Sequence, residues 1–163
     1  DTTLDWEKTE FQNQGQIFDF NNFAGALYFS YNFVSEKDEE DEIEYKYLND
    51  IVINNISLTS NFIFEKQVGS DAKKSTEFAF SNYLKFQNFL PYEIDFGVFG
   101  FSEFGEISGF EVFDEQTHQY GLQFEKELHI NDIEFEFALG WLHGFTNASA
   151  DQTFIWNLEV EFN

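Results

Sequence analysis

The chain has 163 residues, a formal net charge of −23 at pH 7 and an aromatic content of 21%, including 24 phenylalanines. Its eight basic residues are all lysine and are far outnumbered by acids, so it has no basic patch that could neutralise phosphates, which excludes nucleic-acid binding. The absence of cysteine excludes disulfides and cysteine-based metal sites, and no apolar run approaches the roughly 18 residues of a membrane helix.

Nine segments alternate apolar and polar residues with a period of two, which predicts strands with one apolar and one polar face. In chain order they span residues 4–11, 23–33, 43–51, 56–66, 76–86, 92–104, 118–128, 133–142 and 153–162. No long segment has helical spacing, and residues 15–22 (GQIFDFNN) are ambiguous because they could extend the second strand. We therefore expect an all-β fold, an up-and-down antiparallel β-barrel of about 8–12 strands, as a single domain over residues 1–163.

The connections between these segments differ in length. Three are tight, namely VINN (52–55), NFLP (88–91) and HIND (129–132), and they alternate with four long polar ones over 34–42, 67–75, 105–117 and 144–152. In an up-and-down meander alternate connections lie at the same end, so one rim should carry short turns and the other long loops. Bacterial outer-membrane barrels have this asymmetry. The first connection, around QNQGQ (12–16), should be short and looks longer.

Small and charged residues share one phase of the predicted strands. The small ones are Ala24, Ala26, Ser30, Ser57, Thr59, Ala79, Ser81, Gly97, Gly121, Ala138 and Gly140. The crowded interior of a small barrel needs such residues, whereas a solvated exterior does not. This phase is therefore expected to face inward.

The opposite phase is bulky and nearly free of charge, as in Leu27, Phe29, Phe124 and Phe137. Such a surface could contact acyl chains, and the tryptophans Trp6, Trp141 and Trp156 lie near strand ends, where membrane-interface aromatics are found. A soluble lipocalin-like barrel, with its phenylalanines around an apolar ligand and its carboxylates outside, accounts for the alternation equally well. The loop asymmetry and the small-residue phase favour a transmembrane barrel of the outer-membrane type.

The C-terminal third carries three short motifs: Gly144-Phe145-Thr146-Asn147-Ala148, Asp151-Gln152-Thr153 and Asn157-Leu158-Glu159-Val160-Glu161-Phe162. Together they resemble the closing hairpin of a family of uncharacterised Gram-negative outer-membrane proteins. The stretches DEIEYKYLNDIV (41–52) and FGVFGFSEFGEI (96–107) resemble the family more loosely. The resemblance implies a barrel in the bacterial outer membrane and supplies no activity.

This chain departs from the family in two respects. It continues with Asn163 after the terminal aromatic residue, and family members are longer at the N-terminus. Nine strands is also an odd number, whereas single-chain bacterial barrels have even numbers. Either one strand is misassigned or N-terminal strands are missing here.

Six glutamates lie on the polar phase of the last three predicted strands: Glu125, Glu127, Glu134, Glu136, Glu159 and Glu161. If this phase lines a lumen, they form an acidic wall that favours cations, as rings of acidic residues do in pores. We favour instead a packed or narrow, structural interior, because a small barrel can be filled by its own side chains. Lys46 and Lys85 lie on the same phase and could pair with carboxylates there.

Two acidic runs lie in predicted loops, SEKDEEDE (35–42) and FDEQ (113–116). Their oxygen atoms could bind calcium, but no spacing matches an EF-hand, and a solvated loop is the simpler interpretation.

The sequence contains no evident catalytic constellation. His118, His129 and His143 are far apart and form no HExxH-like pair, so a zinc site is not expected. A hydrolase on the barrel wall would need a serine, a histidine and an acid or amide together, and nothing in the sequence shows that Ser102 meets His143. A membrane-embedded hydrolase is thus the weakest of three hypotheses, and we expect no catalytic residue, cofactor or metal centre.

These patterns favour an integral protein of the bacterial outer membrane, pore-like or structural, with an acidic lumen that favours cations and with no enzymatic activity. Its expected partners are outer-membrane lipid, small cations such as calcium at the acidic loops, and another copy or another protein of a membrane complex.

Overall fold

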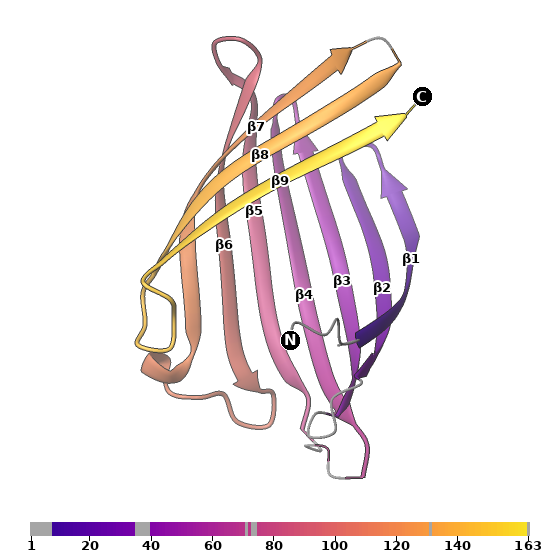
Figure 1. Ribbon diagram of the computed structural model, residues 1–163, viewed down its shortest axis with the longest axis vertical. Coiled ribbons are helices and arrows are strands. Elements are labelled where there is room, and N and C mark those ends of the chain that lie inside the picture. The colour runs from indigo at the N-terminus through magenta and orange to yellow at the C-terminus, as the bar shows by residue number, and fades with distance from the viewer. Residues whose placement is uncertain (1–7, 35–39, 71, 73–74, 131, 163) are drawn as a thin grey trace, which may run out of the picture.

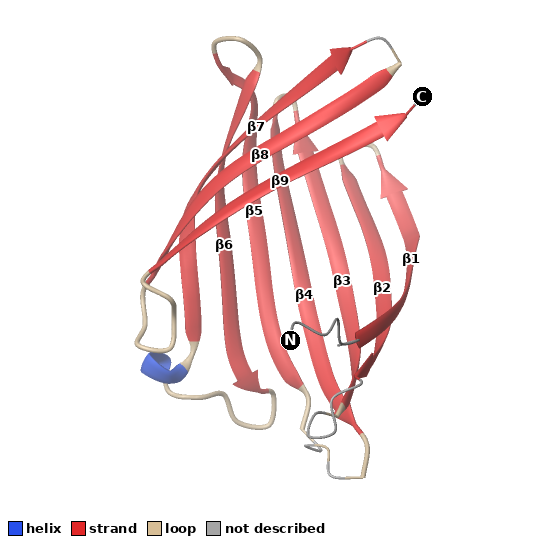
Figure 2. Ribbon diagram, viewed as in Figure 1, coloured by secondary structure: helices blue, strands red, loops and turns tan. Residues whose placement is uncertain are grey.

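The computed structural model describes residues 8–34, 40–70, 72, 75–130 and 132–162. Nearly all of them form strands, drawn in red in Figure 2. The strands are β1 (Lys8–Phe20), β2 (Phe23–Val34), β3 (Asp41–Ile53), β4 (Ile56–Val68), β5 (Glu77–Leu90), β6 (Ile94–Glu106), β7 (Thr117–Ile130), β8 (Ile133–Gly144) and β9 (Gln152–Phe162). A turn of 3-10 helix, η1 (Phe113–Glu115), precedes β7. None of the helical structure among the described residues is long and apolar enough to cross a membrane.

The nine strands lie side by side in chain order in one antiparallel sheet. The sheet curls into a half-barrel, so that β7, β8 and β9 cross in front of the middle strands in the view of Figure 1. The predicted all-β, up-and-down barrel fold is confirmed in this form. The last eight predicted strands agree with β2 to β9 to within a few residues at each end.

The first hairpin differs from its prediction. β1 extends to Phe20, so residues 15–20 belong to this strand rather than to the second, and the turn lies at Asn21 and Asn22 instead of around residues 12–16. Asn21 has a positive φ of 51°, a conformation that asparagine tolerates better than most residues. Residues 4–7 of the predicted first strand lie outside the described residues.

With this correction, the loop asymmetry extends over the whole described sheet. Short turns follow β1, β3, β5 and β7, and longer connections follow β2, β4, β6 and β8. In Figure 1 the strand ends joined by the short turns lie at the top, which we call the turn rim, and the strand ends joined by the long connections lie at the bottom, which we call the loop rim.

The two faces of the sheet have opposite character. Most of the described residues that are at most 8% exposed lie on the face of small and acidic side chains, for example Ser30, Ser57, Ala79, Ser81 and Ala138. The curl turns this face inward, since Lys85 of β5 and Glu125 of β7 form an ion pair on it that reaches across β6. We call it the concave face, and we call the opposite, largely apolar face the convex face.

At the centre of β6 the distribution is reversed, with a bulky residue on the concave face and small residues on the convex face. Phe99 lies on the concave face opposite Gly121 of β7, whereas Gly100 and Ser102 lie on the convex face. A Cβ atom on Gly100 would come within 2.3 Å of the Tyr120 ring, so that ring covers the glycine. On the concave face at this level the rings of Phe99 and Tyr83 lie together, with their centroids 6.3 Å apart.

β1 and β9 are the two edges of the described sheet, and no pairing between them occurs in it. Both strands run from the loop rim to the turn rim, so they would pair with each other in parallel. The eight pairings within the described sheet are all antiparallel.

Candidate functional site on the acidic concave face

The six glutamates singled out in the sequence all lie on the concave face of β7, β8 and β9. The strand register aligns them in rows. Glu127, Glu136 and Glu159 lie directly opposite one another, as do Glu134 and Glu161. Glu125 lies opposite Ala138. Residues paired across antiparallel strands bring their side chains within a few ångströms, so these rows concentrate negative charge at the turn-rim end of the face.

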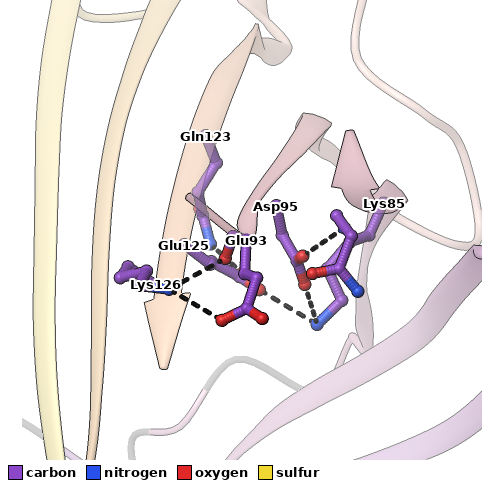
Figure 3. Close-up of polar contacts among 7 residues, drawn as sticks. Lys85, Glu93, Asp95, Gln123, Glu125 and Lys126 are labelled. Carbon is purple, nitrogen blue, oxygen red and sulfur yellow. Dashed lines mark hydrogen bonds and ion pairs between the residues drawn. The ribbon is translucent and has the colours of Figure 1, made fainter. Parts of the chain in front are cut away.

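Glu125 belongs to a set of polar contacts that joins three strands (Figure 3). The Nζ atom of Lys85 lies 3.0 Å from Glu125 Oε2 and 3.8 Å from Asp95 Oδ2. The second oxygen of Glu125 accepts a hydrogen bond of 2.7 Å from Gln123. Only 10% of the Glu125 side chain is exposed, so removal of Lys85 would leave a mostly buried carboxylate without its counter-charge.

The predicted pairing of lysines with carboxylates on this face occurs at both positions. Lys85 binds Glu125 as described, and Lys46 of β3 lies 2.9 Å from Glu44 on the same strand. Each lysine neutralises the carboxylate that it contacts most closely, and the acidic face as a whole keeps an excess of negative charge.

A cavity of about 470 Å³ opens on the concave face near the turn rim. Its lining comes from β5 to β8 and their turns and comprises Lys85, Gln87, Asn88, Glu93, Asp95, Glu125, Glu127, His129 and Glu136. Five carboxylates thus face one lysine and one histidine. Such a cavity attracts cations and repels anions.

A second acidic cavity, of about 340 Å³, lies near the loop rim. Its acidic residues are Glu65, Glu77, Glu103, Glu106, Glu111 and Glu115, and no basic residue lines it. Glu115 belongs to the acidic run 113–116 noted in the sequence. The other five glutamates were not identified as site residues, although Glu65, Glu77 and Glu103 continue the polar phase of their strands.

Ser102 contacts His118 and not His143, the histidine considered with it in the sequence. Its Oγ lies 2.9 Å from Nδ1 of His118, whose Nε2 lies 2.8 Å from Oε1 of Gln116. His143 instead contacts the backbone carbonyl of Asp151, at 2.9 Å. The chain of hydroxyl, imidazole and amide has the composition of a hydrolase triad.

The surroundings of this cluster indicate a structural role. Ser102 is only 1% exposed, and the rings of Phe104 and Phe113 pack against His118. The backbone N–H of His118 donates to Ser149 Oγ at 2.8 Å, and the same hydroxyl donates to the His118 carbonyl at 3.1 Å. The cluster therefore holds the connections after β6 and β8 against the start of β7, with its serine covered.

The acidic loop runs show no arrangement of calcium ligands among the described residues. In the first run, residues 35–39 lie outside the described residues, and Asp41 accepts hydrogen bonds from the Tyr31 hydroxyl and the Val34 N–H. In the second, Asp114 and Glu115 are exposed on η1, while Gln116 is engaged with His118. A calcium role for either loop stays a prediction.

Comparison with known proteins gave no match to this chain, whether with family models, with curated proteins or with solved structures. The resemblance of the C-terminal motifs to outer-membrane proteins therefore remains a prediction from the sequence.

Proposed function

We propose that this chain forms the wall of an integral β-barrel in the bacterial outer membrane. It acts there as a pore-like or structural surface protein whose acidic lumen favours cations, and it has no enzymatic activity. The concave face would be the lumen, and the convex face would contact lipid.

The observation that carries this proposal is the exposure of large apolar side chains on the convex face. Large apolar residues between 36% and 74% exposed on this face include Leu27, Phe29, Phe33, Tyr45, Phe64, Leu122, Phe124, Phe137, Leu139, Trp141, Phe154, Trp156 and Leu158. Soluble monomers rarely expose a continuous apolar surface of this extent, whereas acyl chains would cover it without cost. The strands, at 11 to 14 residues, are long enough for tilted strands to span a bilayer.

The soluble lipocalin-like alternative fits these observations less well. It needs a cavity lined by phenylalanine and an exterior of carboxylates, but the two concave cavities described above are lined mainly by polar and acidic residues. The apolar rows lie on the other face.

A membrane-spanning sheet also requires that its edges be paired, because unpaired backbone groups are too costly in hydrocarbon. The proposal therefore entails that β1 and β9 pair with strands from outside the described sheet, either from the same polypeptide or from another chain. An antiparallel closure needs at least one strand between these edges, since β1 and β9 run in the same direction.

The convex face is interrupted by a row of polar residues that indicates where a protein partner would bind. Asn49, Ser60 and Asn82 lie opposite one another on β3, β4 and β5. In a membrane, polar side chains are stabilised when they form hydrogen bonds with another protein segment. This row is the best candidate for contact with the membrane-complex partner expected from the sequence.

Ion conductance tests the lumen assignment. Reconstituted in planar bilayers under a salt gradient, the chain should give a reversal potential of the sign for cation selectivity, because carboxylates line the concave cavities. The double variant Glu127→Gln, Glu136→Gln should lower that selectivity, whereas Asp114→Asn, on the exposed η1, should leave it unchanged. Anion selectivity would contradict the acidic lumen. A complete lack of current would exclude the pore-like role and leave the structural role.

A further inference from the structure

The hairpin of β7 and β8 brings three metal-binding side chains together at the turn rim. His129 Nε2 lies 3.1 Å from Glu127 Oε1 and 3.2 Å from Glu134 Oε2, and the three ligand atoms all lie within 4.8 Å of one another. We propose that Glu127, His129 and Glu134 form a binding site for a divalent transition-metal ion, with Zn²⁺ as the reference ion.

The strand register accounts for this convergence. Glu127 and His129 are two residues apart on β7 and so project from the same face, and Glu134 is the direct partner of His129 on β8. Ile130 pairs with Ile133 in the same register, next to the three ligands. The three ligands are thus positioned by the hairpin itself rather than by a loop that would have to close around the ion.

The spacing fits a zinc ion. With bonds of about 2.0–2.1 Å and tetrahedral angles, two ligand atoms of one zinc ion lie about 3.4 Å apart. The nitrogen–oxygen distances of 3.1 and 3.2 Å need only a small expansion to reach that value. One imidazole and two carboxylates would leave a fourth position open, as in catalytic rather than structural zinc sites.

Uncompensated charge around the three residues independently favours a cation. Glu127 lies opposite Glu136, and Glu134 lies opposite Glu161, and carboxylates in direct cross-strand positions destabilise a sheet. Lys85, the lysine of the adjoining cavity, is engaged with Glu125 and Asp95. A bound dication would offset repulsion that no lysine in these paired rows can offset.

The adjoining cavity and the histidine define what kind of ion fits. Glu127 and His129 both line the cavity of about 470 Å³, so an ion there could keep bound water and remain accessible. Calcium and magnesium take oxygen ligands, whereas imidazole suits zinc, nickel, copper and cobalt. This site therefore differs in its chemistry from the calcium binding predicted for the acidic loops. It is also independent of the proposed membrane location, because it lies on the concave face whatever covers the convex one.

The test is a Zn²⁺ titration of the full chain in metal-free buffer, in competition with a chromophoric chelator and at physiological ionic strength. We expect one zinc ion per chain. The variants His129→Ala, Glu127→Gln and Glu134→Gln should each weaken binding by at least about tenfold, the loss that even an outer-shell partner can cause. His143→Ala and Glu111→Gln are matched controls that remove a histidine and a glutamate elsewhere, and they should bind as the parent chain does.

Two further readouts separate a built site from general attraction to an acidic surface. Co²⁺ in place of Zn²⁺ should give visible absorption bands of a site with a nitrogen ligand, and His129→Ala should abolish them, while excess Ca²⁺ should not displace Zn²⁺. The glutamine variants preserve side-chain size, and circular dichroism establishes that each variant keeps its sheet. Folded variants that bind Zn²⁺ as tightly as the parent chain, or equal competition by Ca²⁺, would overturn the proposal, whatever the outcome of the conductance experiment.

Discussion

Replacing Leu139 with lysine should destabilise the chain in lipid vesicles by about 2–4 kcal/mol, the cost of a lipid-facing lysine near the bilayer midplane. Leu139 lies near the middle of β8 on the convex face, is 50% exposed and is flanked in register by Phe124 and Trp156. The free energy of unfolding, measured by denaturant titration in vesicles, gives the penalty.

The matched control is Asn157→Lys, which places the same charge on the concave face of β9, opposite Ala138. Because that face is acidic, this variant should lose little or no stability. If the convex face were in water instead, Leu139→Lys would also change stability by no more than about 0.5 kcal/mol, as for most surface substitutions. Equal and small effects of the two variants would therefore contradict the lipid-facing assignment.

Gly121→Ala should reduce stability by about 3 kcal/mol or more, at the upper end of overpacking penalties. A Cβ atom on Gly121 would come within 1.7 Å of the backbone carbonyl oxygen of Trp141 on the neighbouring strand. A backbone atom cannot move aside as a flexible side chain can, so β7 and β8 would have to separate locally. Denaturant unfolding, or loss of the folded form on refolding into detergent, measures the effect.

Gly140→Ala is the control, since it adds the same methyl group to the same hairpin. The nearest atom to a Cβ there is Gln123 Oε1 at 3.4 Å, an ordinary contact. Alanine at this position should be neutral or slightly stabilising, because it lowers the conformational entropy of the unfolded chain. Similar losses for both variants would show that the close approach of the strands at Gly121 is not as described.

Much of the fold could be predicted from the two-residue alternation, because side-chain phase in a strand follows directly from backbone geometry. The first hairpin could not. Its strand carries a register shift between Gln16 and Phe18, which breaks the alternation, while the QNQGQ segment has the composition of a turn. The true turn is marked only by Asn21 and Asn22, the same pair of asparagines that occurs in the predicted turn VINN (52–55).

The acidic character of the concave face was also visible in the sequence, but the side-chain clusters were not. Glu127 and His129 are two apart in the chain, yet their meeting with Glu134 depends on a register that only the paired strands define. The contact between Ser102 and His118 could not be predicted for a related reason. The small-to-large pattern reverses at the centre of β6, so strand phase alone gave no reason to place Ser102 beside a histidine on the convex face.

The central claim is that the convex apolar rows face acyl chains, and tryptophan fluorescence tests it most directly. Trp141 and Trp156 lie on that face and are 41% and 71% exposed, whereas Trp6 lies outside the described residues and is replaced by phenylalanine for the measurement. In vesicles of lipids brominated along their acyl chains, emission should be strongly quenched and insensitive to iodide in the aqueous phase. Emission that iodide quenches and brominated lipid leaves unchanged would contradict the proposed outer-membrane location.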